Sequence, residues 1–96
     1  MVVRFTNRAA RQLDTILADL KEVSPGAAKT FRQRVEDVCE RIGQFPAGFQ
    51  EIGKRKGVHR VPMVRFPYLI FYTMSGDEVV VLRIRHGARG DLLDNL

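Results

Sequence analysis

The chain has 96 residues, of which 45% are hydrophobic, and its formal net charge is +5 at pH 7. This length suits one domain, residues 1–96, with a modest core. No run approaches the roughly 18 apolar residues of a transmembrane helix, and the N-terminus lacks the apolar segment of a signal peptide, so we expect a soluble cytoplasmic protein with no membrane partner.

Residues 2–5 are mostly β-branched and aromatic, and they predict a short first strand. Thr6 then stands where the N-cap of a helix is expected. From Ala9 to Val23 the apolar residues recur at helical spacing, with charged residues between them. This pattern predicts an amphipathic helix that buries one of its faces.

A second helix is predicted after a very short break. Ser24 suits its N-cap and Pro25 its first position, and Gly43 is placed to end it. So short a connection indicates an antiparallel helical hairpin. Cys39, the single cysteine, falls on the apolar face of this helix, where a buried small hydrophobe is a better interpretation than a nucleophile. It forms no ligand spacing with the two histidines, so we expect no metal ion and no cofactor.

Residues 44–57 are rich in glycine, proline and charge, and they predict a loop. We expect its apolar residues, Phe45, Phe49 and Ile52, to tuck under the sheet. Three strands are then predicted, at about residues 58–64, 68–74 and 79–85. Pro62 in the first of them cannot donate a ladder hydrogen bond, so it favours a sheet edge or a bulge.

The last predicted strand indicates how the sheet is oriented. Simple alternation puts Val80, Leu82 and Ile84 on one face, and Arg83 and Arg85 on the other. We expect the apolar face to pack on the helical hairpin and the basic face to stay open. The expected architecture is an α+β domain of order β-α-α-β-β-β, with an antiparallel helical hairpin on one face of a mainly antiparallel sheet.

Positive charge is concentrated in the second half of the chain. Between Lys54 and Arg89 there are eight basic residues and only two acidic ones, Asp77 and Glu78. A one-sided basic surface suits a nucleic acid or an acidic polypeptide. A solvated sheet face would carry similar residues, so the charge pattern by itself leaves these three interpretations open.

Several short motifs, in their order along the chain, resemble a known family. They are Ser24-Pro25 followed by Ala27-Ala28 and Phe31, Phe45-Pro46, Gly57-Val58-His59-Arg60, the Tyr68-to-Tyr72 strand, and Leu82-Arg83-Ile84-Arg85-His86-Gly87-Ala88-Arg89. Together with the element order, they resemble the ParE/RelE superfamily of toxins of bacterial type II toxin–antitoxin systems, most closely its ParE branch. The resemblance covers essentially the whole chain.

The two branches of this superfamily imply different activities. RelE-like members cleave messenger RNA on the ribosome, which requires a base, an acid and cations around the phosphate. Their site includes an arginine of the central strand and often a tyrosine near the C-terminus. Here Leu69 stands at the central-strand position and no tyrosine follows Tyr72, while Arg89 matches an arginine of both branches. This departure favours the ParE branch, whose members inhibit DNA gyrase and block replication by binding rather than by catalysis.

The resemblance leaves three functions open. The favoured one is a ParE-like inhibitor of gyrase. The others are a RelE-like, ribosome-dependent mRNA endonuclease, and a member that has lost its toxicity and only binds its antitoxin. His86 and Arg89 are weak candidates for a catalytic role, and a structural role for His86 at the end of its strand is the better interpretation.

The resemblance also implies a cognate ParD-like antitoxin, commonly a ribbon-helix-helix DNA-binding protein. Its C-terminal segment would fold on binding and wrap the toxin in a hetero-oligomeric complex. We expect it to contact the helical hairpin at Leu13, Leu17, Leu20 and Phe31. The residues expected to bind the target or the antitoxin are basic, and they are Lys54, Arg55, Lys56, Arg60, Arg83, Arg85 and Arg89.

Overall fold

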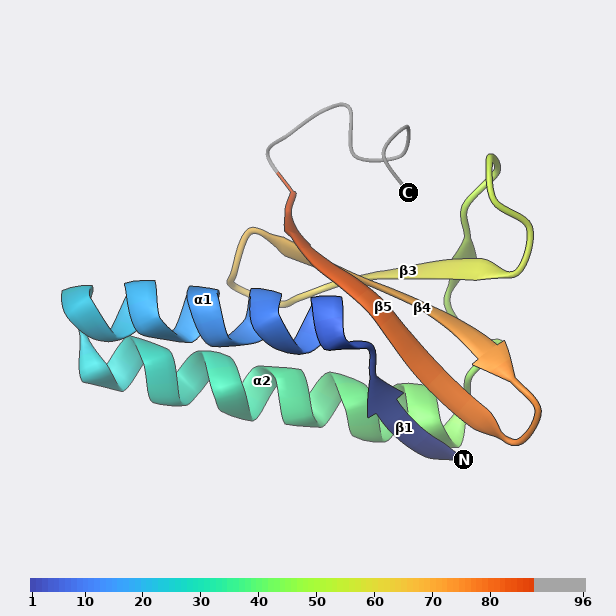
Figure 1. Ribbon diagram of the computed structural model, residues 1–96, viewed down its shortest axis with the longest axis horizontal. Coiled ribbons are helices and arrows are strands. Elements are labelled where there is room, and N and C mark those ends of the chain that lie inside the picture. Colours follow the sequence, from blue (N-terminus) through green and yellow to red (C-terminus); the bar gives the residue numbers. More distant parts are fainter. Residues whose placement is uncertain (88–96) are drawn as a thin grey trace.

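The computed structural model describes residues 1–87, and in them two helices cover one face of a five-stranded sheet (Figure 1). The elements are β1 (Val2–Phe5), α1 (Asn7–Val23), α2 (Pro25–Gln44), β2 (Gln50–Glu51), β3 (Val58–Pro62), β4 (Tyr68–Ser75) and β5 (Glu78–His86). The strand order is β1-β5-β4-β3-β2, with β1 parallel to β5 and the other pairs antiparallel. The expected α+β architecture is confirmed, and the two-residue strand β2 is an addition to it.

Both helices begin at the residues that the sequence predicts. The Thr6 hydroxyl accepts a hydrogen bond from the backbone N–H of Ala9 at 3.0 Å. The Ser24 hydroxyl accepts one from the N–H of Ala27 at 3.3 Å, and Pro25 opens the second helix. Each cap satisfies a backbone donor that the first helical turn leaves without a partner. The antiparallel helical hairpin follows, as Figure 1 shows.

Gly43 does not end α2, because the helix continues to Gln44. The glycine lies instead where the N-terminus of the chain meets the last helical turn. The Met1 ammonium donates a hydrogen bond to the Gly43 carbonyl at 2.7 Å. A Cβ atom at position 43 would lie 2.9 Å from the Met1 carbonyl oxygen and 3.3 Å from Cγ2 of Val3. The glycine is therefore required by the close approach of β1 to α2.

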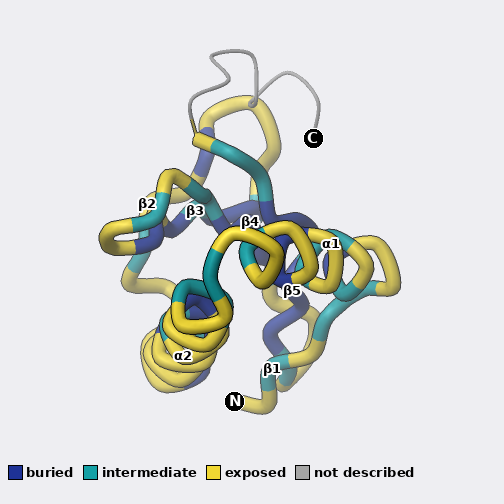
Figure 2. Tube along the Cα trace, turned by 90° about the vertical axis from the view of Figure 1, so that its left-hand side faces the viewer, coloured by how far each residue is buried: buried dark blue, intermediate teal, exposed yellow. Residues whose placement is uncertain are grey.

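The main core fills the space between the helices and the sheet, and Figure 2 shows buried segments on the facing sides of both layers. Its buried members from the helices are Ala9, Ile16, Leu17, Phe31, Val35, Val38 and Ile42, and those from the sheet and its loops are Val61, Met63, Ile70, Tyr72, Val79, Val81 and Ile84. Phe31 is fully buried and packs edge-on against the rings of Phe66 and Tyr68. This layer holds the hairpin on the sheet.

A second, smaller core lies on the opposite face of the sheet. Ile52, Val58 and Phe71 are buried there together, with Leu69 and Leu82 packed against them. The expectation of an open face is therefore wrong for this half of the sheet. Ile52 is tucked in as expected and Phe49 is half-buried against the main core, whereas Phe45 is 68% exposed.

A β-bulge in β5 changes the faces that simple alternation predicts. Phe71 pairs with Arg83, but the next residue, Tyr72, pairs with Val81, so Leu82 is an extra residue in its strand. Leu82 consequently packs with the second core, away from Ile84 on the helix side. The prediction that Val80 and Leu82 share a face with Ile84 is wrong, because Val79 and Val81 join Ile84 in the main core, whereas Arg83 is opposite Ile84 as expected.

The outer edge of β5 is covered first by β1 and then by α1. The parallel pairing with β1 ends where Phe5 meets Val81. From there the Thr6 N–H donates to the Val81 carbonyl at 3.0 Å, and the Thr6 hydroxyl donates to the Leu82 carbonyl at 3.2 Å. Six residues after Thr6, in the second turn of α1, Oε1 of Gln12 accepts a hydrogen bond from the N–H of Ile84 at 2.8 Å. Side chains of α1 thus replace the missing strand and fix the helix along β5.

Replacing Gly43 with alanine is expected to destabilise the protein by about 1–3 kcal/mol, because the new methyl group would overpack the contact with Met1 and Val3. Urea unfolding monitored by circular dichroism measures the loss. Gly53→Ala is the matched control, since nothing lies within 4 Å of a Cβ at that position. Equal stability of the two variants would show that β1 does not constrain α2.

Replacing Gln12 with alanine is expected to cost about 1–3 kcal/mol, because the buried N–H of Ile84 would lose its acceptor. The measurement is urea unfolding together with hydrogen exchange of the Ile84 amide, which is expected to lose protection. Gln33→Ala is the control, because Gln33 makes only an exposed bond to Asp37 on its own helix. Unchanged exchange at Ile84 would contradict the role given to Gln12.

Cys39 is expected to react slowly with alkylating reagents in the folded protein. Burial, with a smaller contribution from Glu36, raises the pKa of its thiol to about 11, whereas a free cysteine has a pKa of about 8.5. This rise lowers the thiolate fraction at pH 8 on the order of a hundredfold, and the thiolate is the reactive form. Iodoacetamide labelling with and without urea measures the difference. A native rate close to the unfolded rate would rule out a buried thiol.

Candidate functional site

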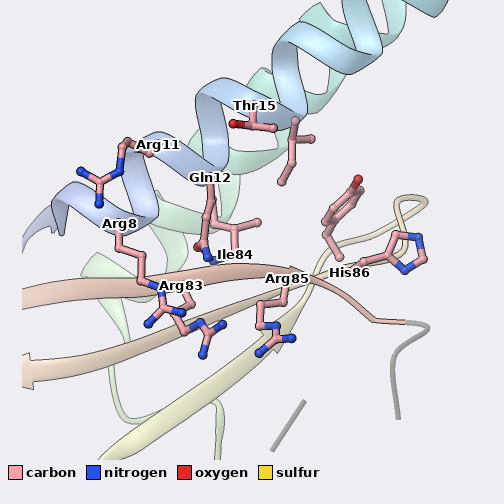
Figure 3. Close-up of a pocket in the computed structure, with 10 residues that line it drawn as sticks. Arg8, Arg11, Gln12, Thr15, Arg83, Ile84, Arg85 and His86 are labelled. Atoms are coloured by element: carbon pink, nitrogen blue, oxygen red, sulfur yellow. The ribbon is translucent and has the colours of Figure 1, made fainter. Parts of the chain in front are cut away.

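Four arginines line an open cavity of about 570 Å³ between α1 and the C-terminal half of β5. Arg8 and Arg11 come from the first two turns of the helix, and Arg83 and Arg85 come from the strand. Figure 3 shows Arg8 extending from α1 toward Arg83, with Arg85 further along β5. The remaining lining residues are Gln12, Thr15, Ile16, Tyr68, Ile84 and His86. No carboxylate is among these described lining residues.

A second cavity of about 250 Å³ continues this basic surface toward the loop before β3. It shares Arg8 and Arg83 with the first cavity and adds Arg55 from the loop. Five arginines therefore converge from one helix, one strand and one loop. They form the arginine cluster: Arg8, Arg11, Arg55, Arg83 and Arg85.

The arginine cluster brings positively charged guanidinium groups close together in a partly desolvated environment. Arg83 is only 8% exposed, and burial lowers the pKa of its guanidinium, with further lowering by the neighbouring charges of Arg85 and Arg8. On Arg85, Nη1 is buried and has no hydrogen-bond partner within residues 1–87. Arginine stays protonated at neutral pH, so the cluster is a site of strongly positive potential.

The structure brings together only part of the predicted basic set. Arg55, Arg83 and Arg85 lie in the arginine cluster. Lys54 and Lys56 are exposed in the same loop as Arg55. Arg60 lies in β3, where it donates a hydrogen bond to the side chain of Gln50 at 3.1 Å, and it lines neither cavity. Arg89 is outside the described residues.

Sequence reasoning gave no role to Arg8 and Arg11, which form the helical wall of the cavity. The signal was present, since Arg8, Arg11, Gln12 and Thr15 are spaced at i, i+3, i+4 and i+7 and so share one face of α1. A polar stripe on an amphipathic helix usually faces solvent. Only the contact between α1 and the edge of β5 turns this stripe toward the strand arginines.

The two histidines have different surroundings. His86 is at the end of β5, edge-on to the Tyr68 ring with centroids 5.2 Å apart. His59 is buried, stacks on Tyr72 at 5.1 Å and donates from Nδ1 to the Phe49 carbonyl at 2.9 Å. Tyr72 in turn donates to the Pro46 carbonyl at 2.6 Å, and burial raises the pKa of its hydroxyl to about 12. His59 and Tyr72 therefore anchor the segment that leads from α2 to β3.

The helical hairpin carries a groove of about 340 Å³ on its surface. Leu17 and Ala28 line it, and Lys21, Lys29 and Arg32 add positive charge. Of the four residues predicted for a hairpin contact, Phe31 lies entirely within the core and Leu17 is mostly buried, whereas Leu13 and Leu20 are half-buried beside the core.

Residues 1–87 contain no group of three histidine, cysteine, aspartate or glutamate side chains that could hold a metal ion. Within the same residues, neither α1 nor α2 combines the length and the hydropathy that a membrane crossing requires.

Comparisons with known proteins agree with the fold and identify the family. Residues 3–90 match the family described as "ParE toxin of type II toxin-antitoxin system, parDE". A curated relative from Sinorhizobium fredii, "Putative toxin Y4kP", is 31% identical over 84 residues, which cover 88% of this chain and 85% of the relative.

Solved structures show the same arrangement of helices and strands. A chain of the chromosomal ParDE toxin–antitoxin system from P. aeruginosa superposes with a TM-score of 0.64 at 27% identity, covering 90% of this chain and 95% of that one. A chain of the RelB–RelE antitoxin–toxin complex from Methanococcus jannaschii shares the fold, with a TM-score of 0.53 at 18% identity and 96% of each chain covered. The protein therefore belongs to the ParE toxin family of type II toxin–antitoxin systems.

Proposed function

We propose that this protein inhibits DNA gyrase and blocks replication in the cytoplasm until a cognate antitoxin neutralises it. Membership of the ParE family supports the toxin role. The arginine cluster supplies the surface through which the toxin would act, because it combines an open cavity of about 570 Å³ with strong positive potential. In this mechanism the toxin binds its target and performs no covalent chemistry.

The observation that favours this function over RNA cleavage is the environment of Leu69. This residue of β4 pairs with Arg85 and packs against the second core beside Phe71. An apolar side chain there cannot stabilise the charge that develops on a phosphate during cleavage. The nearby Tyr72 hydroxyl is committed to the Pro46 carbonyl and has a raised pKa, so it is a poor proton donor or acceptor at neutral pH.

The proposed antitoxin is ParD-like, and the groove of the hairpin is its proposed binding site. Leu17 and Ala28 would pack against an apolar helix face, while Lys21, Lys29 and Arg32 would pair with acidic side chains around it. The half-buried Leu13 and Leu20 would extend the apolar contact. Phe31 would support that surface from within the core, since it has no exposed area of its own.

Purified toxin is expected to inhibit supercoiling by gyrase, and Arg11→Ala is expected to weaken the inhibition about tenfold, equivalent to roughly 1.4 kcal/mol. Arg11 is exposed, so its loss leaves the core intact. Arg34→Ala on α2 removes the same charge outside the arginine cluster and is expected to keep full inhibition. A supercoiling and cleavage assay with a dilution series of each variant measures the effect.

Addition of the antitoxin is expected to restore gyrase activity in the same assay. The proposal would be contradicted if the antitoxin-free protein left gyrase unaffected and instead cleaved messenger RNA on translating ribosomes. Growth that continues normally when the toxin is expressed alone would identify a member that only binds its antitoxin.

A further inference from the structure

We propose that the arginine cluster binds the phosphate backbone of DNA, so that the toxin contacts nucleic acid directly. This inference goes beyond inhibition of gyrase, because the DNA contact would exist in the absence of any target protein. The site includes Arg8 and Arg11 of α1, which sequence reasoning left without a role (Figure 3).

The first support is the chemistry of the side chains. Every cation that lines the two cavities is an arginine, and the lysines of the neighbouring loop lie outside both linings. A guanidinium presents a planar fork of N–H donors that matches two oxygens of one phosphate, whereas an ammonium acts as a point charge. Purely solvated basic faces have no need for this preference.

The second support is that the cations are already in position. Arg83 and Arg55 take part in other interactions within the protein, so the argument rests on Arg8, Arg11 and Arg85. The buried Nη1 of Arg85 lacks a hydrogen-bond partner within residues 1–87, and a buried donor without an acceptor is costly. The helical wall is fixed opposite it by the bond from Ile84 to Gln12. Nη1 itself is covered by protein, so a phosphate bound by the exposed Arg8 and Arg11 would lower the cost of the crowded positive charges without contacting that atom.

The third support is the shape of the positive surface. The two cavities share Arg8 and Arg83, so the cations form a continuous strip that runs from α1 to the loop of Arg55. Arg8 and Arg11 line the helical side of this strip, and Arg85 lines its strand side. A DNA strand carries a charge on every nucleotide and would contact both sides of this strip. The i and i+2 side chains of an acidic peptide strand also share one face, so the competition with an acidic polypeptide described below separates the two partners.

The proposal is tested by fluorescence anisotropy with the full-length toxin and a labelled DNA duplex. If at least three phosphates are contacted, the affinity is expected to fall about 40-fold between about 50 mM and 200 mM salt. Arg8→Gln and Arg85→Gln are each expected to weaken binding and to reduce the slope of log K against log salt by about one. Arg8 is exposed, so its variant carries the test even if Arg85→Gln fails to fold.

Arg32→Gln is the matched control, because it removes the same charge from the groove between the helices, outside the arginine cluster. Its affinity for DNA and its salt slope are expected to equal those of the unmodified protein. A loss equal to that of Arg8→Gln would show that net charge alone drives binding, and would overturn the proposal.

Two competitors distinguish DNA from other anionic partners. Polyglutamate or single-stranded RNA that displaced the duplex more effectively than unlabelled duplex at equal charge would overturn the proposal in favour of that partner. The experiments also distinguish a failure of DNA binding from a failure of the proposed function. If the wild-type protein or a variant inhibited gyrase without binding DNA, the proposed DNA contact would be overturned and the proposed inhibition of gyrase would not.

Discussion

The outer edge of β5 changes partner halfway along the strand, and this change sets the position of α1. The parallel strand β1 covers the edge as far as Val81, after which Thr6 and Gln12 take over. Gln12, in the second turn of the helix, accepts a hydrogen bond from the N–H of Ile84. This bond places the polar stripe of α1, which contains Arg8 and Arg11, along the strand. The wall of the arginine cavity is thus a consequence of how one sheet edge satisfies its hydrogen bonds.

The same arrangement explains how a small domain can hold five like charges near one another. Arg83 is buried on the sheet, where desolvation and its arginine neighbours oppose its charge. Two apolar layers, one on each face of the sheet, offset the free-energy cost of this buried charge. A binding partner with negative charge would relieve the repulsion, so binding energy and stability would rise together. Charge crowding of this kind weakens the isolated fold. Perturbed charged groups of this kind cluster at functional sites.

Local signals in the sequence predicted the elements, whereas contacts between distant segments decided the site. Helix caps at Thr6 and Ser24 depend on neighbouring residues, so they could be read directly. The bulge at Leu82 depends on the pairing of β5 with β4, and alternation therefore misplaced that residue. Arg8 joins Arg83 only because α1 replaces β1 at the strand edge, a contact across some 75 residues that no local pattern encodes.

One helix, α1, contributes to both of the surfaces that we propose for binding, the arginine cavity and the groove of the hairpin. The stripe of Arg8, Arg11, Gln12 and Thr15 lines the arginine cavity, and further along α1 Leu17, Ala18 and Lys21 line the groove of the hairpin. An antitoxin helix seated in that groove would therefore lie nearly two turns of α1 away from Arg11. A short extension of the antitoxin helix, or the volume of the antitoxin alone, would exclude a large target from the arginine cluster. Neutralisation by this route would act through steric exclusion, while α1 keeps its contacts with the main core and its bond to β5.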